Sequence, residues 1–223
     1  MENSRLKSLV LLSGGLDSSA NLAFARHYDT PLLALTIDYG QRAVKKEIEA
    51  SAKLAAYYEV PHQVLDLRWL GALGGSALTS TSIDVPKMET AKLDDLVTSK
   101  STARQVWVPN RNGLFINAAA AIAESKKIQQ VIVGFNKEEA ATFPDNSSQF
   151  LGVATLSLRY STGTGVKVAC YTDMMMKTEI VQALRNLATP FPFEMVWSCY
   201  LGGEKMCGEC ESCKRFYRAT GKS

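Results

Sequence analysis

The decapeptide LLSGGLDSSA, Leu11–Ala20, joins a short apolar run to a segment with helical periodicity. The run, residues 8–13, predicts a buried strand, and the apolar residues that recur from Asp17 onward predict a helix. Two glycines at the junction let backbone N–H groups approach an anion closely, and the start of a helix adds partial positive charge. A strand, a glycine pair and a helix in this order therefore predict a cradle for phosphate, with the neighbouring serines as further donors.

The same alternation of strand and helix continues along the chain. Apolar runs predict further strands at residues 32–37, 62–67, 130–135 and 166–171. Helical spacing predicts helices at residues 44–55, 113–126, 147–160 and 177–187. This order predicts an α/β fold, a Rossmann-like and mostly parallel sheet with helices on both faces.

Polar residues collect where three of the predicted strands end. These segments are residues 13–18, residues 38–42 and residues 134–145. Ligands of open α/β sheets bind past the carboxyl ends of the strands. The three segments are therefore expected to meet in one site.

Residues 69–106 interrupt the alternation with weak periodicity and many Ser, Thr, Gly and Lys residues. So long an irregular segment is usually functional or mobile, and we expect a lid or an interface with some helix. We divide the chain into a nucleotide-binding domain, residues 1–190, which includes this excursion, and a small tail, residues 191–223.

Composition narrows the class of protein. Apolar residues make up 46% of the 223 residues, which is enough for a substantial core, and the net charge is only +3. That charge is too small to favour a protein that coats nucleic acid, so no nucleic-acid partner is expected. The polar start lacks the features of an export signal, and no stretch approaches ~18 apolar residues. A cytoplasmic protein is expected.

The tail carries four of the five cysteines, Cys199, Cys207, Cys210 and Cys213. Two Cys-x-x-Cys steps share Cys210, and glycines between the cysteines allow the turns that bring four thiolates together. Four thiolates suit a closed structural zinc site, although an iron–sulfur cluster and unmetallated thiols are alternatives. The remaining Cys170, in a predicted strand, is interpreted as a small buried residue.

The Ser-Gly-Gly-Leu-Asp-Ser motif resembles the pyrophosphate-binding loop of the ATP pyrophosphatases, the PP-loop superfamily. These enzymes have an adenine nucleotide alpha hydrolase-like fold and split ATP into AMP and pyrophosphate. The alternative is an ordinary glycine turn with Asp17 as a helix cap. The resemblance implies that ATP contacts the loop residues Leu12, Ser13, Gly14, Gly15, Leu16, Asp17, Ser18 and Ser19.

Four further blocks extend the resemblance to nearly the whole chain. They are Asp38-Tyr-Gly-Gln-Arg42, Val108-Pro-Asn-Arg-Asn112, Phe143-Pro-Asp145 and the tail from Trp197 to Cys213. In this order they are similar to the 7-cyano-7-deazaguanine synthases of queuosine biosynthesis. That family implies an ATP-dependent carbon–nitrogen ligase that turns 7-carboxy-7-deazaguanine and ammonia into the nitrile. The acid and then the amide would be adenylated, with Mg²⁺ bridging the phosphates.

The resemblance also implies roles for charged residues. Asp17 would hold the cation that accompanies pyrophosphate, and Lys177 would steady the α-phosphate as charge develops. Arg111 is placed for a carboxylate or a phosphate, and Tyr39 and Arg42 for the nucleotide or the acyl-adenylate. The alternatives are surface positions for Lys177 and Arg42.

The purine side of the substrate is expected to meet Asn110, Asn112, Phe143 and Asp145. Asp145 would accept N–H groups from the guanine-like edge while Phe143 packs on the ring. The alternatives are that Asn112 and Asp145 cap helices. The usual run in the family is Tyr-Pro-Asp-Cys-Arg, but this chain has Phe143-Pro-Asp-Asn-Ser147 and lacks the arginine. The detailed contacts to the base are therefore left open.

Three other functions compete with this interpretation. A related enzyme would pass the adenylated acid to another amine or to a protein, and a tRNA thiolase would need a catalytic cysteine and a basic face. A third candidate is a non-catalytic zinc module. The two histidines, His27 and His62, give no Cys–His glutaminase, so free ammonium is the expected nitrogen source. A homodimer through residues 69–106 is expected.

Overall fold

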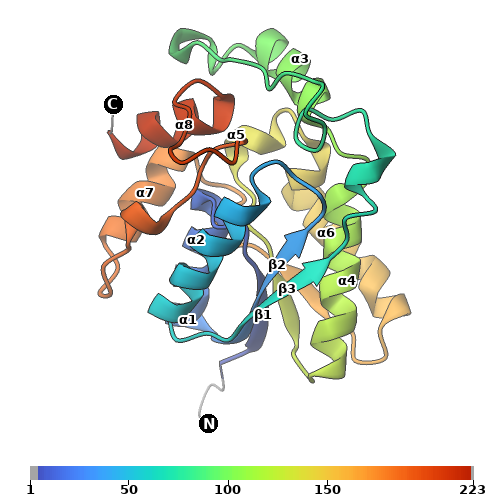
Figure 1. The fold of residues 1–223 in the computed structure, drawn as a ribbon. Coiled ribbons are helices and arrows are strands. Elements are labelled where there is room, and N and C mark those ends of the chain that lie inside the picture. The colour runs from blue at the N-terminus through green and yellow to red at the C-terminus, as the bar shows by residue number, and fades with distance from the viewer. Residues whose placement is uncertain (1–4, 222–223) are drawn as a thin grey trace.

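The computed structural model describes residues 5–221 and has a parallel sheet at its centre (Figure 1). The strands are β1 (Lys7–Leu11), β2 (Thr30–Asp38), β3 (His62–Asp66), β4 (Gln130–Ile132) and β5 (Lys167–Ala169). All neighbouring pairs are parallel, in the order β3-β2-β1-β4-β5. The chain moves outward from β1 to β3 and then returns to the other side of β1. The predicted Rossmann-like sheet is confirmed, and its switch point lies between β1 and β4.

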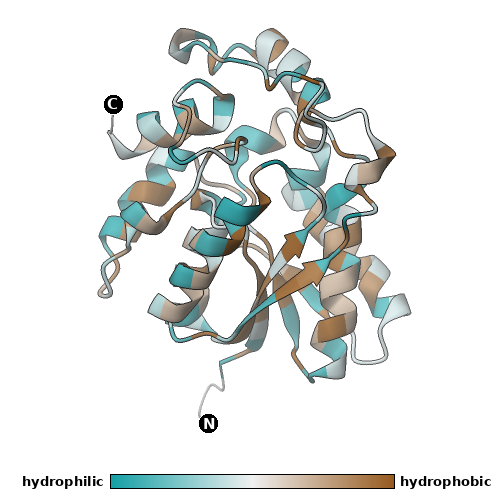
Figure 2. Cartoon of the chain, in the orientation of Figure 1, coloured by the Kyte–Doolittle hydropathy of each residue, from teal (hydrophilic) through white to brown (hydrophobic). Residues whose placement is uncertain are grey.

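Helices cover both faces of the sheet, as the alternating pattern predicts. Helices α1 (Leu16–Tyr28), α2 (Val44–Tyr57) and α7 (Lys177–Arg185) pack on one face, and α4 (Arg111–Ser125) and α6 (Ser148–Ser161) on the other. Neighbouring residues of β1 point to opposite faces, so Val10 joins the first core and Leu9 the second. Figure 2 shows hydrophobic residues concentrated on the strands between these layers.

Strands β4 and β5 are shorter than the apolar runs predict, ending at Ile132 and Ala169 instead of residues 135 and 171. The chain leaves the sheet early because the residues after β4 line the site, as described below. Two helices were not predicted, α5 (Lys137–Ala140) and α8 (Glu211–Thr220). Helix α8 contains the last cysteine of the tail, and its buried face consists of Cys213, Arg215 and Phe216.

The excursion lies against the tail at the carboxyl end of the sheet, where Figure 1 shows α3 (Leu96–Val106) above the sheet and near α8. Met88 N donates to the carbonyl oxygen of Glu209 at 2.9 Å, and Arg215 donates to the carbonyl oxygen of Leu93 at 2.8 Å. Phe216 of the tail also joins the core formed by α1 and α7. The division into two domains and the lid or interface role stay predictions.

A search for membrane-spanning helices over residues 5–221 identifies none with the required length and apolar character.

Candidate functional site

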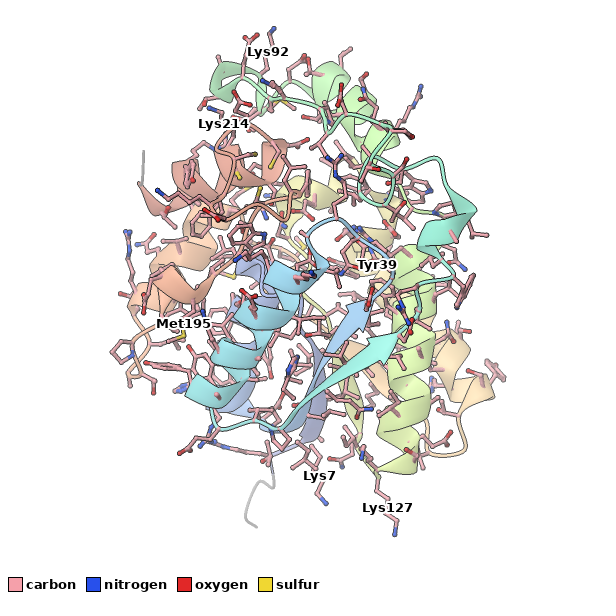
Figure 3. The ribbon with its side chains drawn as sticks, in the orientation of Figure 1. Lys7, Tyr39, Lys92, Lys127, Met195 and Lys214 are labelled. Atoms are coloured by element: carbon pink, nitrogen blue, oxygen red, sulfur yellow. The ribbon has the colours of Figure 1, made fainter. Side chains whose placement is uncertain are left out.

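A cavity of about 240 Å³ opens at the carboxyl ends of β1, β2 and β4. Figure 3 shows Tyr39 at this edge of the sheet, opposite Lys7 and Lys127. Residues from all three polar segments line the cavity, as the sequence predicts. The predicted site residues in its wall are Leu12, Ser13, Gly15, Leu16, Asp17, Ser18, Tyr39, Arg111, Asn112, Phe143 and Lys177. The tail contributes Trp197–Tyr200 to the same wall.

The glycine loop, residues 13–18, is held in shape by its own serines. Ser18 Oγ accepts the backbone N–H of Ser13 at 3.1 Å, and Ser19 Oγ donates to the carbonyl oxygen of Gly15 at 2.7 Å. Gly14 has a φ of +76°, which favours glycine. Helix α1 has Gly15 at its N-cap and no side-chain cap. The N–H of Leu16 donates to Ser198 Oγ at 3.4 Å, which leaves those of Asp17 and Ser18 available to an anion. The alternative of Asp17 as the helix cap is wrong.

Gly134, just after β4, lies directly against this loop. A Cβ atom at Gly134 would come within 2.5 Å of both the nitrogen and the Cα of Ser18. Backbone atoms at that distance cannot give way without moving the start of α1. Only glycine therefore lets the chain after β4 pass so close to the glycine loop.

We expect Gly134→Ala to weaken ATP binding by at least about tenfold, because the displaced loop no longer presents its N–H groups together. Isothermal titration with ATP measures this loss. Gly152→Ala in α6 is the control, since nothing lies within 4 Å of the added Cβ. An unchanged ATP affinity of the Gly134 variant would show that the loop tolerates the contact.

Asp17, Lys177 and Glu139 form a buried charged cluster beside the glycine loop. Lys177 Nζ donates to Asp17 and, at 2.9 Å, to Glu139 Oε1 of α5. Its side chain is 8% exposed, so the alternative of a surface lysine is wrong. Glu138, the neighbour of Glu139, accepts the backbone N–H of Lys177 at 2.8 Å and fixes the start of α7.

Two carboxylates share one ammonium in this cluster, which leaves it with excess negative charge. Burial raises the pKa of Asp17 to about 6, although the charge of Lys177 opposes this shift. Burial also disfavours ionisation of Glu139, but the charge of Lys177, its hydrogen bond and a smaller contribution from Asn136 together outweigh burial and lower the Glu139 pKa. Asp17 Oδ1 is buried and has no partner within residues 5–221. A hard cation such as Mg²⁺ fits this donor set, because it prefers oxygen ligands and would satisfy that atom.

A second polar group lies where β2 ends. Gln41 donates to Ile37 O at 3.0 Å and to Glu47 Oε2 at 2.7 Å, and accepts from Tyr39 N at 2.9 Å. Arg111, at the start of α4, donates to the Tyr39 hydroxyl at 3.3 Å. No ion pair of Arg111 occurs in the described part of the chain. Its guanidinium is therefore available to an anionic ligand.

Some residues in the segment after α5 do not lie where the sequence predicts them. Phe143 lies parallel to Trp107, with ring centroids 6.2 Å apart. Asn146 lines the cavity, whereas Asp145 lies outside the lining. Ser147 is the N-cap of α6, accepting from Phe150 N at 3.2 Å, so the alternative of Asp145 as that cap is wrong. Ser147, which stands where the family usually has an arginine, is therefore a helix cap in this chain.

Four more predicted residues lie outside the cavity lining. Gly14 and Ser19 support the glycine loop from behind, and Arg42 donates to the carbonyl oxygen of Ile83 at 3.1 Å. Asn110 precedes α4 in a left-handed conformation, with φ of 51°. Asn112 lines the cavity but is not a cap, because its amide donates to Asp145 O at 3.4 Å.

The sequence did not single out several residues of the cavity wall. Gln41 lies inside the Asp-Tyr-Gly-Gln-Arg block, and Glu139 within residues 134–145, yet neither received a role. Glu47 comes shortly after the Asp-Tyr-Gly-Gln-Arg block, on the first turn of α2, and it lines the cavity. Its nearness to that block in the sequence is the signal that could have identified it. Ser198 and Tyr200 come from the tail, and their approach to the loop depends on the tertiary fold.

The four cysteines of the tail come together as predicted. Their sulfur atoms all lie within 4.8 Å of one another, and the Cys207 and Cys213 sulfurs are 3.8 Å apart. Zn–S bonds of about 2.3 Å in a tetrahedron give sulfur–sulfur distances of about 3.8 Å. The spacing fits a single ion better than a cluster, which spreads its thiolates over several iron atoms.

Comparisons with known proteins agree with the sequence resemblance. A family model described as "Queuosine biosynthesis protein QueC" matches residues 7–222. The 7-cyano-7-deazaguanine synthase of Desulforamulus reducens is 50% identical over 214 residues, covering 96% of this chain and 93% of that protein. The protein of that name from Methanosarcina mazei is 43% identical over 217 residues, covering 96% and 93%. A solved NMN synthetase from Francisella tularensis aligns with a TM-score of 0.48 and 15% identity, over 99% of this chain and 79% of that one.

Proposed function

The chain belongs to the QueC family of queuosine biosynthesis proteins, and on this premise we propose that it makes 7-cyano-7-deazaguanine from 7-carboxy-7-deazaguanine, ammonia and ATP. The acid is adenylated and ammonia displaces AMP to give the amide. The amide oxygen is then adenylated, and loss of the second AMP leaves the nitrile. Each adenylation releases pyrophosphate, so two ATP are consumed for each nitrile.

The single observation that carries the proposal is the charged cluster beside the glycine loop. A reaction at the α-phosphorus needs the departing pyrophosphate held on one side and positive charge near the α-phosphate on the other. The loop N–H groups and the α1 N-terminus provide the first, and buried Lys177 provides the second. Bound Mg²⁺ neutralises phosphate charge, and Asp17 and Glu139 are the residues that would hold it.

Arg111 is proposed to bind the carboxylate of the substrate. It lines the cavity next to Tyr39 and has a free guanidinium, which suits a planar carboxylate. Phe115, Phe143 and Trp197 supply aromatic surface for a flat purine-like ring. Asn112 and Asn146 offer amide donors and acceptors to its edge, while Asp145 would reach the ring only after a local rearrangement.

Product analysis tests the proposed function directly. The protein is incubated with ATP, Mg²⁺, ammonium and 7-carboxy-7-deazaguanine, and mass spectrometry follows the nitrile while AMP and pyrophosphate are quantified. We expect two AMP and two pyrophosphate for each nitrile. Release of ADP would refute cleavage at the α-phosphate. Accumulation of acyl-adenylate without nitrile would favour transfer of the acid to another amine or to a protein.

A further inference from the structure

Glu47 is a cavity carboxylate that stands apart from the cluster around Lys177. It lies on the first turn of α2, and Gln41 Nε2 donates to its Oε2 at 2.7 Å. Within residues 5–221 no ion pair of Glu47 is formed, and no other hydrogen bond reaches its carboxylate. Asp17 and Glu139, by contrast, are both bonded to Lys177. A neutral amide partner leaves Glu47 free to take up and release a proton.

The charged groups around Glu47 favour this exchange near neutral pH. Burial raises its pKa to about 7, while the Gln41 hydrogen bond and the charge of Arg111 from α4 oppose that rise. Asp38 at the end of β2 adds to it, and Tyr39 faces the same group. On its own helix, Lys46 directs its ammonium to the Trp197 ring, 5.7 Å from the centroid.

The proposed reaction needs such a group, and the present inference rests on that proposed function. Ammonium first gives one proton to water, and the resulting ammonia carries three hydrogens into the reaction. The nitrile nitrogen carries none, so all three are lost as protons. A base beside the nitrogen is needed when the amide forms and again when the amide becomes a nitrile. Arg111, the proposed partner of the carboxylate, lines the same cavity as Glu47, and its charge acts on the Glu47 carboxylate. A substrate carboxylate held by Arg111 would therefore bring the reacting carbon near Glu47.

We propose that Glu47 is the catalytic base that accepts the protons lost by the reacting nitrogen. Ammonia attacks the acyl-adenylate carbon, AMP leaves with the electrons of the broken C–O bond, and one N–H proton passes to Glu47. The amide oxygen then attacks the α-phosphorus of the second ATP, pyrophosphate leaves, and Glu47 again takes an N–H proton. Loss of the last N–H proton accompanies departure of the second AMP and forms the nitrile. Glu47 returns each proton to water.

The decisive variant is Glu47→Gln, which keeps an oxygen for the Gln41 hydrogen bond but cannot take a proton. Glu49→Gln, an exposed position on the same helix, is the matched control. Adenylation is followed by pyrophosphate–ATP exchange in the presence of the carboxylic acid and by trapping the acyl-adenylate with hydroxylamine. We expect nitrile formation to fall at least about 100-fold in the Glu47 variant, while adenylation stays within about threefold of the wild type.

Two results would overturn the role of Glu47. One is nitrile formation within about threefold of the wild type, and the other is an equal loss of adenylation, which indicates a structural role. A wild type that makes no nitrile removes the proposed function together with this inference, so the two failures are distinguishable. If the variant does not fold, the wild type decides. At a fixed concentration of free ammonia, its nitrile rate should rise with pH around neutrality while its adenylation rate does not. Parallel profiles contradict the proposal.

Discussion

Lys177→Met is expected to lower the rate of nitrile formation by about 1000-fold, more than any other single change in the cavity wall. The variant loses the one ammonium that faces the glycine loop from α7. Removing a preorganised charge that stabilises a transition state costs on the order of 100- to 1000-fold, and here both adenylations depend on it. Rapid-quench measurement of pyrophosphate release in one turnover isolates the affected step.

The same substitution should destabilise the protein in a pH-dependent manner. Asp17 and Glu139 lose their shared partner, and an uncompensated buried charge costs about 3–5 kcal/mol. The pKa of Asp17, already raised to about 6, would rise further in the variant. Protonation of Asp17 would therefore remove part of the destabilisation as pH falls. In the wild type the pKa of Lys177 lies above its usual value, so its ammonium stays charged at both pH 5 and pH 8. The difference in the free energy of unfolding between the wild type and the Lys177 variant should therefore be smaller at pH 5 than at pH 8.

Lys137→Met is the matched control, since Lys137 is exposed on α5. Urea unfolding at both pH values gives the two free energies of unfolding. A Lys177 variant with normal pyrophosphate release would refute the role of the ammonium at the α-phosphate. A deficit that is the same at both pH values would refute the uncompensated carboxylates as its cause.

The fold was largely predictable because its signals are local. Most of the strands lie in short apolar runs, and helices α2, α4 and α7 repeat their buried residues at helical spacing. The glycine loop is equally local, since a few adjacent residues determine it. Helices α5 and α8 were missed for physical reasons. Helix α5 is a single turn, and the sequence of α8 includes a cysteine and an arginine that are buried only because the tail packs on the rest of the protein.

The candidate site was predicted only in part, because tertiary contacts determine the rest of it. Its strand-end segments meet as expected, but the partner of Lys177 from α5 is Glu139, and no spacing in the sequence links these two residues. Arg42 is predicted to meet the nucleotide or the acyl-adenylate, yet its guanidinium donates to the Ile83 carbonyl in the excursion. Only the path of residues 69–106 determines that contact. The family resemblance itself is confirmed by the match over residues 7–222.

Cys210→Ser is expected to release the metal of the tail and to lower the melting temperature by roughly 10 °C. The metal-binding free energy of a closed thiolate site contributes directly to folding, so losing about 3–5 kcal/mol in a chain of this size has that effect. Elemental analysis should find one zinc for each wild-type chain and none in the variant. Absorption in the visible range would instead indicate an iron–sulfur cluster. Cys170→Ser is the control, because Cys170 lies outside the cysteine cluster.

Activity should fall with the metal even though four thiolates leave no open position for a substrate. Helix α8, which begins beside Cys210, carries Arg215, and Arg215 donates to Glu138 at 2.6 Å. Glu138 in turn accepts the backbone N–H of Lys177, so the tail is bonded through Glu138 to the start of the helix that bears Lys177. Loss of metal should therefore slow pyrophosphate release, and Arg215→Met should slow it with the metal still bound. Full activity in a metal-free Cys210 variant would show that the tail does not position Lys177.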